Sequence, residues 1–101
     1  MNAKEIMSRV DHTLLKQTAT WEDIQAICDE AVKYQAATVM IPSCFIPRIK
    51  AKYGDALKIA TVVGFPNGNC NTAAKIAETA QALADGAVEI DMVINIGMLK
   101  A

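Results

Sequence analysis

The sequence has 101 residues, of which 52% are hydrophobic and 21% are charged, a composition typical of a small globular unit and not of a disordered segment. The formal net charge is -1, and no cluster of Lys or Arg indicates a nucleic-acid or anionic-membrane partner. The N-terminus lacks the apolar core of a signal peptide, and no run approaches the length of a transmembrane helix. We therefore treat residues 1–101 as one unit with no internal domain boundary.

The three cysteines, Cys28, Cys44 and Cys70, are odd in number and widely spaced. None belongs to a C-x-x-C pair, and His12 is the only histidine, so we expect no metal site. This usage favours reduced thiols in a cytosolic protein. We expect each cysteine to be a buried structural thiol.

The first elements are a short helix over residues 3–8 and a strand over residues 9–15. Thr20 then begins a helix, because it is a good N-cap and Asp23 completes an approximate capping box. One apolar face follows at helical spacing, formed by Ile24, Ile27, Cys28, Ala31 and Val32.

Two further strands follow in the middle of the chain. Residues 36–42 form an apolar, partly β-branched run, and residues 44–53 form a short helix with Pro47 near its first turn. Residues 58–65 form the third strand, which ends in the turn signal of residues 66–69.

The last elements are an alanine-rich helix over residues 72–84 and a fourth strand over residues 88–95. Gly86 closes the helix. We expect no helix after the fourth strand. One face of the 72–84 helix is apolar and carries Ala73, Ile76, Ala80 and Leu83.

The strands and helices alternate, which predicts an α/β fold with a parallel sheet covered by helices. The period of about 25 residues is that of a (β/α)8 barrel, in which about 250 residues build eight units. An uncovered fourth strand would expose an apolar face, so we expect these residues to belong to something larger or to associate. An unrelated flavodoxin-like binding domain is the alternative, and it would place neighbouring strands out of sequential order.

The fourth strand carries two carboxylates in an otherwise apolar run. Because side chains alternate along a strand, Glu89 and Asp91 share one face, while Ile90, Met92 and Ile94 point toward the helices. A buried carboxylate is costly unless it is paired or hydrogen-bonded. The pattern alone leaves open whether Asp91 is catalytic or structural, and it favours a structural role for Glu89.

The same alternation places Asp11 and Thr13 on the interior face of the first strand, and we expect Thr61 to join them from the third. His12 should point toward the helices as a hydrogen-bonded structural residue. Parallel strands with a shared polar interior are suited to an α/β active site. No Gly-rich dinucleotide loop or P-loop is present, so nucleotide binding is unsupported. None of the eight lysines lies in the interior of an expected strand, since Lys58 only begins the third, at the end of a barrel opposite to catalysis.

Three segments resemble bacterial deoxyribose-phosphate aldolase in order and spacing. They are Asp11–Lys16 (DHTLLK), Ala60–Gly68 (ATVVGFPNG) and Asp85–Asn95 (DGAVEIDMVIN). The resemblance implies the first four strands of a (β/α)8 TIM barrel. It also implies cleavage of 2-deoxy-D-ribose 5-phosphate to glyceraldehyde 3-phosphate and acetaldehyde through a lysine Schiff base, with no metal or other cofactor.

The resemblance also assigns residues. Asp91 matches the family aspartate that donates and accepts protons beside a lysine pair. Asp11 and Thr13 match positions that line the substrate pocket, and Leu15 and Phe65 match apolar positions near the substrate.

Two departures qualify the resemblance. The second strand of the family commonly carries a cysteine that Met40 replaces here, and Cys44 is not its equivalent. The family's Schiff-base lysine, its partner lysine and its phosphate-binding loops lie in the C-terminal half, outside this sequence. We therefore expect the chain alone to be inactive. A second hypothesis is a non-catalytic half-barrel that self-associates or pairs with a C-terminal half.

Overall fold

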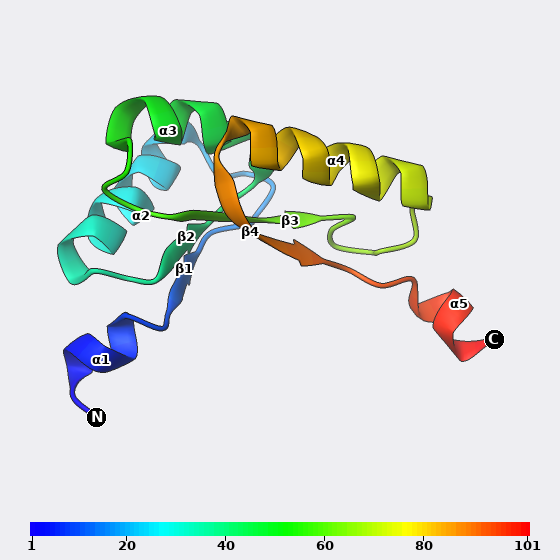
Figure 1. The fold of residues 1–101 in the computed structure, drawn as a ribbon, viewed down its shortest axis with the longest axis horizontal. Coiled ribbons are helices and arrows are strands. Elements are labelled where there is room, and N and C mark those ends of the chain that lie inside the picture. The colour runs from blue at the N-terminus through cyan, green and yellow to red at the C-terminus, as the bar shows by residue number, and fades with distance from the viewer.

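The computed structural model describes residues 1–101, and its centre is one four-stranded parallel sheet. The strands are β1 (Asp11–Thr13), β2 (Thr38–Met40), β3 (Ile59–Val63) and β4 (Ala87–Met92). They lie in the order β1-β2-β3-β4 (Figure 1). This sequential parallel order confirms the expected βα units and opposes the flavodoxin-like alternative, which needs strands out of order.

The helices cover only one face of this sheet. The main ones are α2 (Trp21–Tyr34), α3 (Ile46–Tyr53) and α4 (Thr72–Asp85), and a 3-10 turn, η1 (Ser43–Phe45), precedes α3. The short helices α1 (Ala3–Met7) and α5 (Ile96–Lys100) lie at opposite ends of the molecule (Figure 1). The opposite face of the sheet is open, which makes the molecule half of a barrel. No helix has both the length and the apolar character needed to cross a membrane.

Helix α2 begins where its capping box predicts. The Thr20 side chain accepts a hydrogen bond from the Asp23 amide at 3.2 Å, and the Asp23 carboxylate accepts one from the Thr20 amide at 3.0 Å. These hydrogen bonds lower the pKa of Asp23. Together they satisfy two of the amides that a helix N-terminus leaves without partners. The helix ends at Gln35, which takes a left-handed conformation with φ of 54°.

The core lies between α2, α3 and the two middle strands. Val39 and Ile59 point toward the helices from β2 and β3 and are almost completely buried. Burying an aliphatic side chain of this size contributes roughly 1.5–3 kcal/mol, so this layer is the main source of stability. The helical residues packed against it include Ile24, Cys28, Ile46 and Ile49.

The expectation of three buried thiols holds only for Cys28. Burial in the core raises the pKa of the Cys28 thiol to about 11, which keeps it protonated and unreactive at neutral pH. Cys44 and Cys70 are exposed, because Cys44 lies on the outer side of η1 and Cys70 lies in the loop before α4. All three thiols are free.

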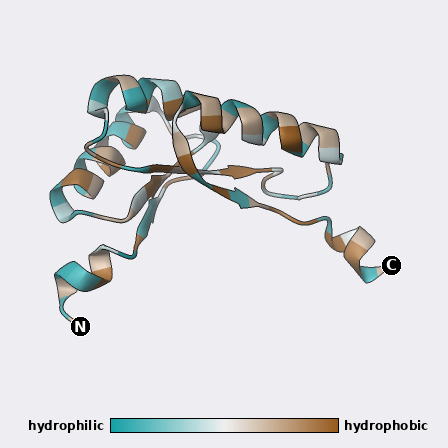
Figure 2. Cartoon of the chain, viewed as in Figure 1, coloured by the Kyte–Doolittle hydropathy of each residue, from teal (hydrophilic) through white to brown (hydrophobic).

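Helix α4 does not place its expected apolar face against the sheet. Ala82 is its only buried residue, and Lys75 and Thr79 are half-buried on the same side. Ile76 and Leu83 are instead exposed, with 64% and 51% of their surface accessible. Hydrophobic bands recur along this helix in Figure 2. The apolar stripe therefore points sideways along the sheet, to where a neighbouring element would pack.

The end of β4 also differs from expectation. The strand ends at Met92, and a short helix that the sequence analysis did not predict begins after Asn95. The Asn95 side chain caps α5 by accepting a hydrogen bond from the Met98 amide at 3.0 Å. This helix projects away from the sheet and leaves β4 uncovered (Figure 1).

Candidate active site

The candidate site lies on the open face of the sheet. Residues that pair across parallel strands point to the same side, and the register pairs Asp11 with Thr38, and Val62 with Asp91. Glu89 pairs with Ala60 on this face, after a register shift between Ile59 and Ala60. The predicted inward direction of Glu89 and Asp91 therefore agrees with the register.

Thr61 does not belong to this face. It pairs with Ile90, which packs against the core, and its side chain is fully buried on the helix-covered side. Its Oγ1 donates a hydrogen bond to the Ile41 carbonyl oxygen at 2.7 Å, which satisfies the buried hydroxyl. The expectation that Thr61 lines the interior is wrong, because its pairing with Ile90 places it on the helix-covered face.

Asp11 is held in place by a neighbouring strand. Thr38 Oγ1 donates a hydrogen bond to Asp11 Oδ1 at 2.7 Å. Thr13 Oγ1 donates one back to the Asp11 carbonyl oxygen at 2.8 Å. Asp11 and Thr13 are both exposed on the open face, where a ligand could reach them.

The carboxylates of the open face lie close enough to interact. The charge of Asp11 is the largest cause of a raised pKa at Glu89, followed by desolvation and the charge of Asp91. Strands β1 to β4 contain no Lys or Arg that could neutralise this charge. The open face therefore carries negative charge that is suited to a cationic neighbour.

Asp91 lies near the carboxyl end of β4 and is exposed. Its side chain makes no salt bridge, since the two ion pairs in the molecule join His12 to Glu30 and Lys50 to Asp55. In a barrel of parallel strands, catalytic groups lie at the carboxyl ends of the strands. Asp91 thus lies at the edge of the sheet where a barrel of parallel strands gathers its catalytic groups, and no ion pair holds it there.

The two apolar site residues lie at the same end of the sheet. Phe65 is 48% exposed in the turn that follows β3, because the strand ends at Val63 and not at Phe65 as expected. Leu15 is half-buried two residues after the end of β1. The loops that follow β1 and β3 therefore place both side chains on the rim where Asp91 lies.

His12 has the structural role that was predicted. Its Nε2 lies 2.8 Å from Glu30 Oε2, so the side chain points toward α2 and away from the open face. No group of three or more His, Cys, Asp or Glu side chains is arranged to hold a metal ion.

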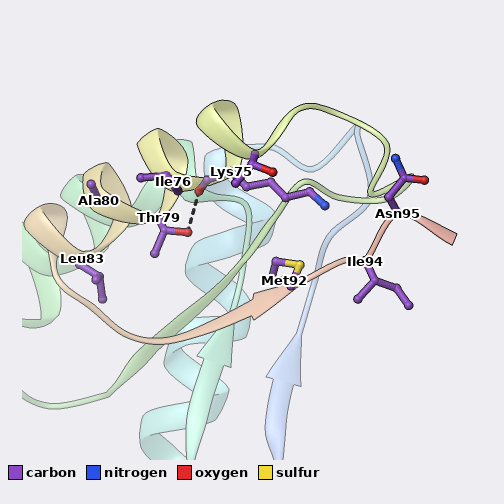
Figure 3. A pocket seen from close by; sticks show the side chains of 9 residues that line it. Lys75, Ile76, Thr79, Ala80, Leu83, Met92, Ile94 and Asn95 are labelled. Carbon is purple, nitrogen blue, oxygen red and sulfur yellow. Dashed lines mark hydrogen bonds between the residues drawn. The ribbon is translucent and has the colours of Figure 1, made fainter. Parts of the chain in front are cut away.

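An apolar groove of about 620 Å³ runs between α4 and β4. Figure 3 shows Leu83 from the helix and Met92 and Ile94 from the strand side lining it. Met92 and Ile94 therefore lie on the helix side of β4 as predicted, but they remain about half exposed because no element covers them. Lys75 extends along one end of the groove toward the strand, and the sequence analysis did not single it out.

Comparison with known proteins identifies the family. The profile of the DeoC/LacD family of aldolases matches residues 5–101. The chain belongs to this family. The deoxyribose-phosphate aldolase of Clostridium botulinum (strain Eklund 17B / Type B) is 62% identical to it over 100 residues, and that of Streptococcus pyogenes serotype M5 (strain Manfredo) is 47% identical.

The matches cover nearly all of the chain but under half of each relative. Both curated relatives are matched over 99% of this chain and 45% of their own length. The deoxyribose phosphate aldolase structure from Aeropyrum pernix gives a TM-score of 0.90 at 28% identity, with 96% of this chain and 42% of that chain covered. A structure from Coccidioides immitis gives a TM-score of 0.91 at 33% identity, with 99% of this chain and 40% of that chain covered. These solved structures agree with a half-barrel.

Proposed function

We propose that this chain supplies one half of the active site of a deoxyribose-phosphate aldolase. The reaction is the reversible cleavage of 2-deoxy-D-ribose 5-phosphate to D-glyceraldehyde 3-phosphate and acetaldehyde. The supporting observation is Asp91, an exposed carboxylate without an ion-pair partner at the carboxyl end of β4. The 62% identity to an aldolase of that name points to this substrate.

Asp91 would move protons in this reaction. Cleavage through a lysine Schiff base requires one proton to leave the hydroxyl of the departing carbon and another to reach the resulting enamine carbon. A carboxylate beside a lysine pair is kept ionised by the lysine charges and can relay both protons through bound water. The unneutralised carboxylates of the open face suit such a cationic neighbour.

The pocket residues have separate roles in this proposal. Asp11, oriented by Thr38, and Thr13 would contact polar groups of the substrate. Leu15 and Phe65 would exclude water from the reacting carbons at the rim, and water exclusion strengthens electrostatic interactions inside a site. No cofactor is needed, because the lysine itself activates the carbonyl group.

The lysine nucleophile is proposed to lie outside these 101 residues. The chain spans about 45% of the length of its curated relatives, and its strands hold no lysine whose pKa desolvation could lower. We expect that borohydride treatment with acetaldehyde leaves the chain unmodified. A stoichiometric adduct on any lysine, detected by mass spectrometry, would overturn this part of the proposal.

A fusion tests the aldolase function directly. This chain replaces the matched 100 residues of the Clostridium botulinum aldolase, and cleavage of 2-deoxy-D-ribose 5-phosphate is measured. We expect activity, and a loss of at least ~100-fold in kcat on Asp91→Asn, which is the scale of a general acid–base contribution. Asp55→Asn is the matched control, because Asp55 is 99% exposed and precedes β3 at the opposite end of the sheet. An inactive but folded fusion would refute the function.

The groove between α4 and β4 favours association as well. Exposed apolar side chains on both walls fit an amphipathic helix, so we propose that the remaining half of an aldolase barrel packs there. The Aeropyrum pernix aldolase is described as a tetramer, and we propose a homo-oligomer for the assembled enzyme here.

Three free thiols suit a reducing compartment, and we propose the cytoplasm.

A further inference from the structure

Two charged side chains on α4 bond to backbone atoms instead of to each other. Lys75 and Glu78 are three residues apart, a spacing at which opposite charges on a helix are close enough to pair. They form no salt bridge here, since the two ion pairs of the molecule involve other residues. Each charge is directed at the end of a strand.

Glu78 bonds to the backbone at the end of β3. Its Oε1 accepts a hydrogen bond from the Gly64 amide at 2.8 Å, one residue before Phe65. Gly64 has a φ of +62°, which favours glycine, and its carbonyl oxygen accepts a hydrogen bond from the Gly68 amide at 2.7 Å. This carboxylate therefore fixes the first residue of the loop that carries Phe65.

Lys75 bonds to the backbone directly after β4. Its Nζ donates a hydrogen bond to the Val93 carbonyl oxygen at 2.8 Å, two residues after Asp91. Figure 3 shows this side chain extended from α4 toward the strand. Its methylene groups also cover Gly64 so closely that a Cβ there would lie 2.9 Å from Lys75 Cε. One lysine thus contacts both the β3 loop and β4.

The loop and β4 are packed together beneath these bonds. A Cβ on Gly68 would collide with the Ile94 carbonyl oxygen and lie 2.7 Å from a Val93 methyl group. The Val93 amide donates a hydrogen bond to the Val63 carbonyl oxygen at 3.2 Å. The β3 loop and the end of β4 are therefore in direct backbone contact on the side where Lys75 bonds.

We propose that Lys75 and Glu78 are positioning residues that hold Phe65 and Asp91 in register at the rim of the active site. Lys75 acts mainly on Asp91, because its hydrogen bond ends at Val93, directly after β4, and Glu78 acts mainly on Phe65. The catalytic consequence rests on the proposed aldolase function, whereas the arrangement itself rests only on the contacts described above.

The test uses Lys75→Met, which keeps the methylene cover over Gly64 and removes the donor. In the active fusion we expect kcat to fall at least ~10-fold while KM changes less than ~2-fold, and Lys75→Arg to restore most of kcat. Glu78→Ala should instead raise KM, since Phe65 lines the pocket. Lys58→Met is the control, because the exposed Lys58 side chain makes no hydrogen bond.

A purely structural role would give a different result. Equal losses in Lys75→Met and Lys58→Met, an unchanged kcat in Lys75→Met, or failure of Lys75→Arg to recover activity would each refute the positioning role. Hydrogen exchange on the 101-residue chain provides an independent readout. In Glu78→Ala we expect the Gly64 amide to exchange at least ~10-fold faster. In Lys75→Met we expect the same increase for the Gly68 amide. Neither rate should change in Lys58→Met.

The two measurements separate the two proposals. If the unsubstituted fusion is inactive, the aldolase function fails, and the exchange rates alone decide whether the arrangement exists. If the fusion is active and the exchange rates of Gly64 and Gly68 do not change, the positioning proposal fails and the aldolase function stands.

Discussion

The two sides of this half-barrel are built differently. On the side of β2, β3, α2 and α3, apolar residues of strand and helix are enclosed, and Ile41 is completely buried. On the side of β4 and α4, only Ala82 and Ala87 are buried, and Ile76 is 64% exposed. The first side is a finished core, whereas the second is a surface shaped for a neighbour.

This contrast explains why the candidate site is incomplete. A barrel interior is enclosed only when its strands close on themselves, and here the carboxylates of β1 and β4 face open space. The core folds around α2 and α3, whereas the carboxylates of the open face have no Lys or Arg from the four strands opposite them. In the proposed enzyme, the second half of the barrel would pack on the side of β4 and α4 and supply the missing charges.

Truncating the same side chain on the two sides should give the largest difference in stability. Ile41→Ala is expected to lower the free energy of unfolding by about 2–5 kcal/mol, because it removes packed atoms and leaves a cavity. Ile76→Ala should cost less than about 0.5 kcal/mol, since its side chain is already in water. Urea unfolding measures both, and similar losses would mean that the groove is closed in solution.

Removing the helix caps sharpens the comparison further. Thr20→Ala on α2 should cost about 1 kcal/mol of global stability. Asn71→Ala removes the equivalent cap of α4, whose side chain accepts a hydrogen bond from the Ala74 amide at 2.9 Å. Because α4 buries little, we expect faster hydrogen exchange in its first turn and a smaller global loss. A larger global loss from Asn71→Ala would contradict this ranking.

The smallest effect concerns the carboxylates of the open face. The raised pKa of Glu89 means that the folded state binds this proton more tightly than the unfolded state. Stability is therefore lost as the pH rises from the ordinary value of 4.5 through the raised pKa of the folded state. Glu89→Gln should raise Tm at pH 7 by on the order of 2 °C and leave it unchanged near pH 3.

The control for this effect is Glu5→Gln on α1, where the exposed carboxylate accepts no hydrogen bond. The Tm of Glu5→Gln should equal that of the unsubstituted chain both at pH 7 and near pH 3. A stabilisation by Glu89→Gln that persists near pH 3 would show that charge repulsion is not the cause.

The sequence predicted the strands, their order and the face of Asp91, because those features depend on local patterns. Alternation along β4 placed Glu89 and Asp91 correctly on one side. The Thr20 and Asp23 box likewise depends on neighbouring residues, and the structure confirms it. Local spacing was sufficient wherever the deciding contacts lie within one element.

Features that depend on several elements were not predictable in this way. The phase of β3, and with it the side of Thr61, depends on its pairing with β2 and β4. The apolar face of α4 could be read from its spacing, but not its direction: Ile76 and Leu83 are exposed, while Lys75, Thr79 and Ala82 are the less exposed side. Lys75 was missed because its partner is a carbonyl oxygen 18 residues away, which no side-chain pattern reveals.

Mixing this chain with the remaining part of the Clostridium botulinum aldolase, prepared as a separate polypeptide, tests the central claim most directly. We predict that each part alone is inactive and that mixing produces cleavage of 2-deoxy-D-ribose 5-phosphate. Substituting Leu83→Asp in the groove should abolish the gain by preventing assembly. Activity in the chain alone, or a bound but inactive mixture, would contradict the account.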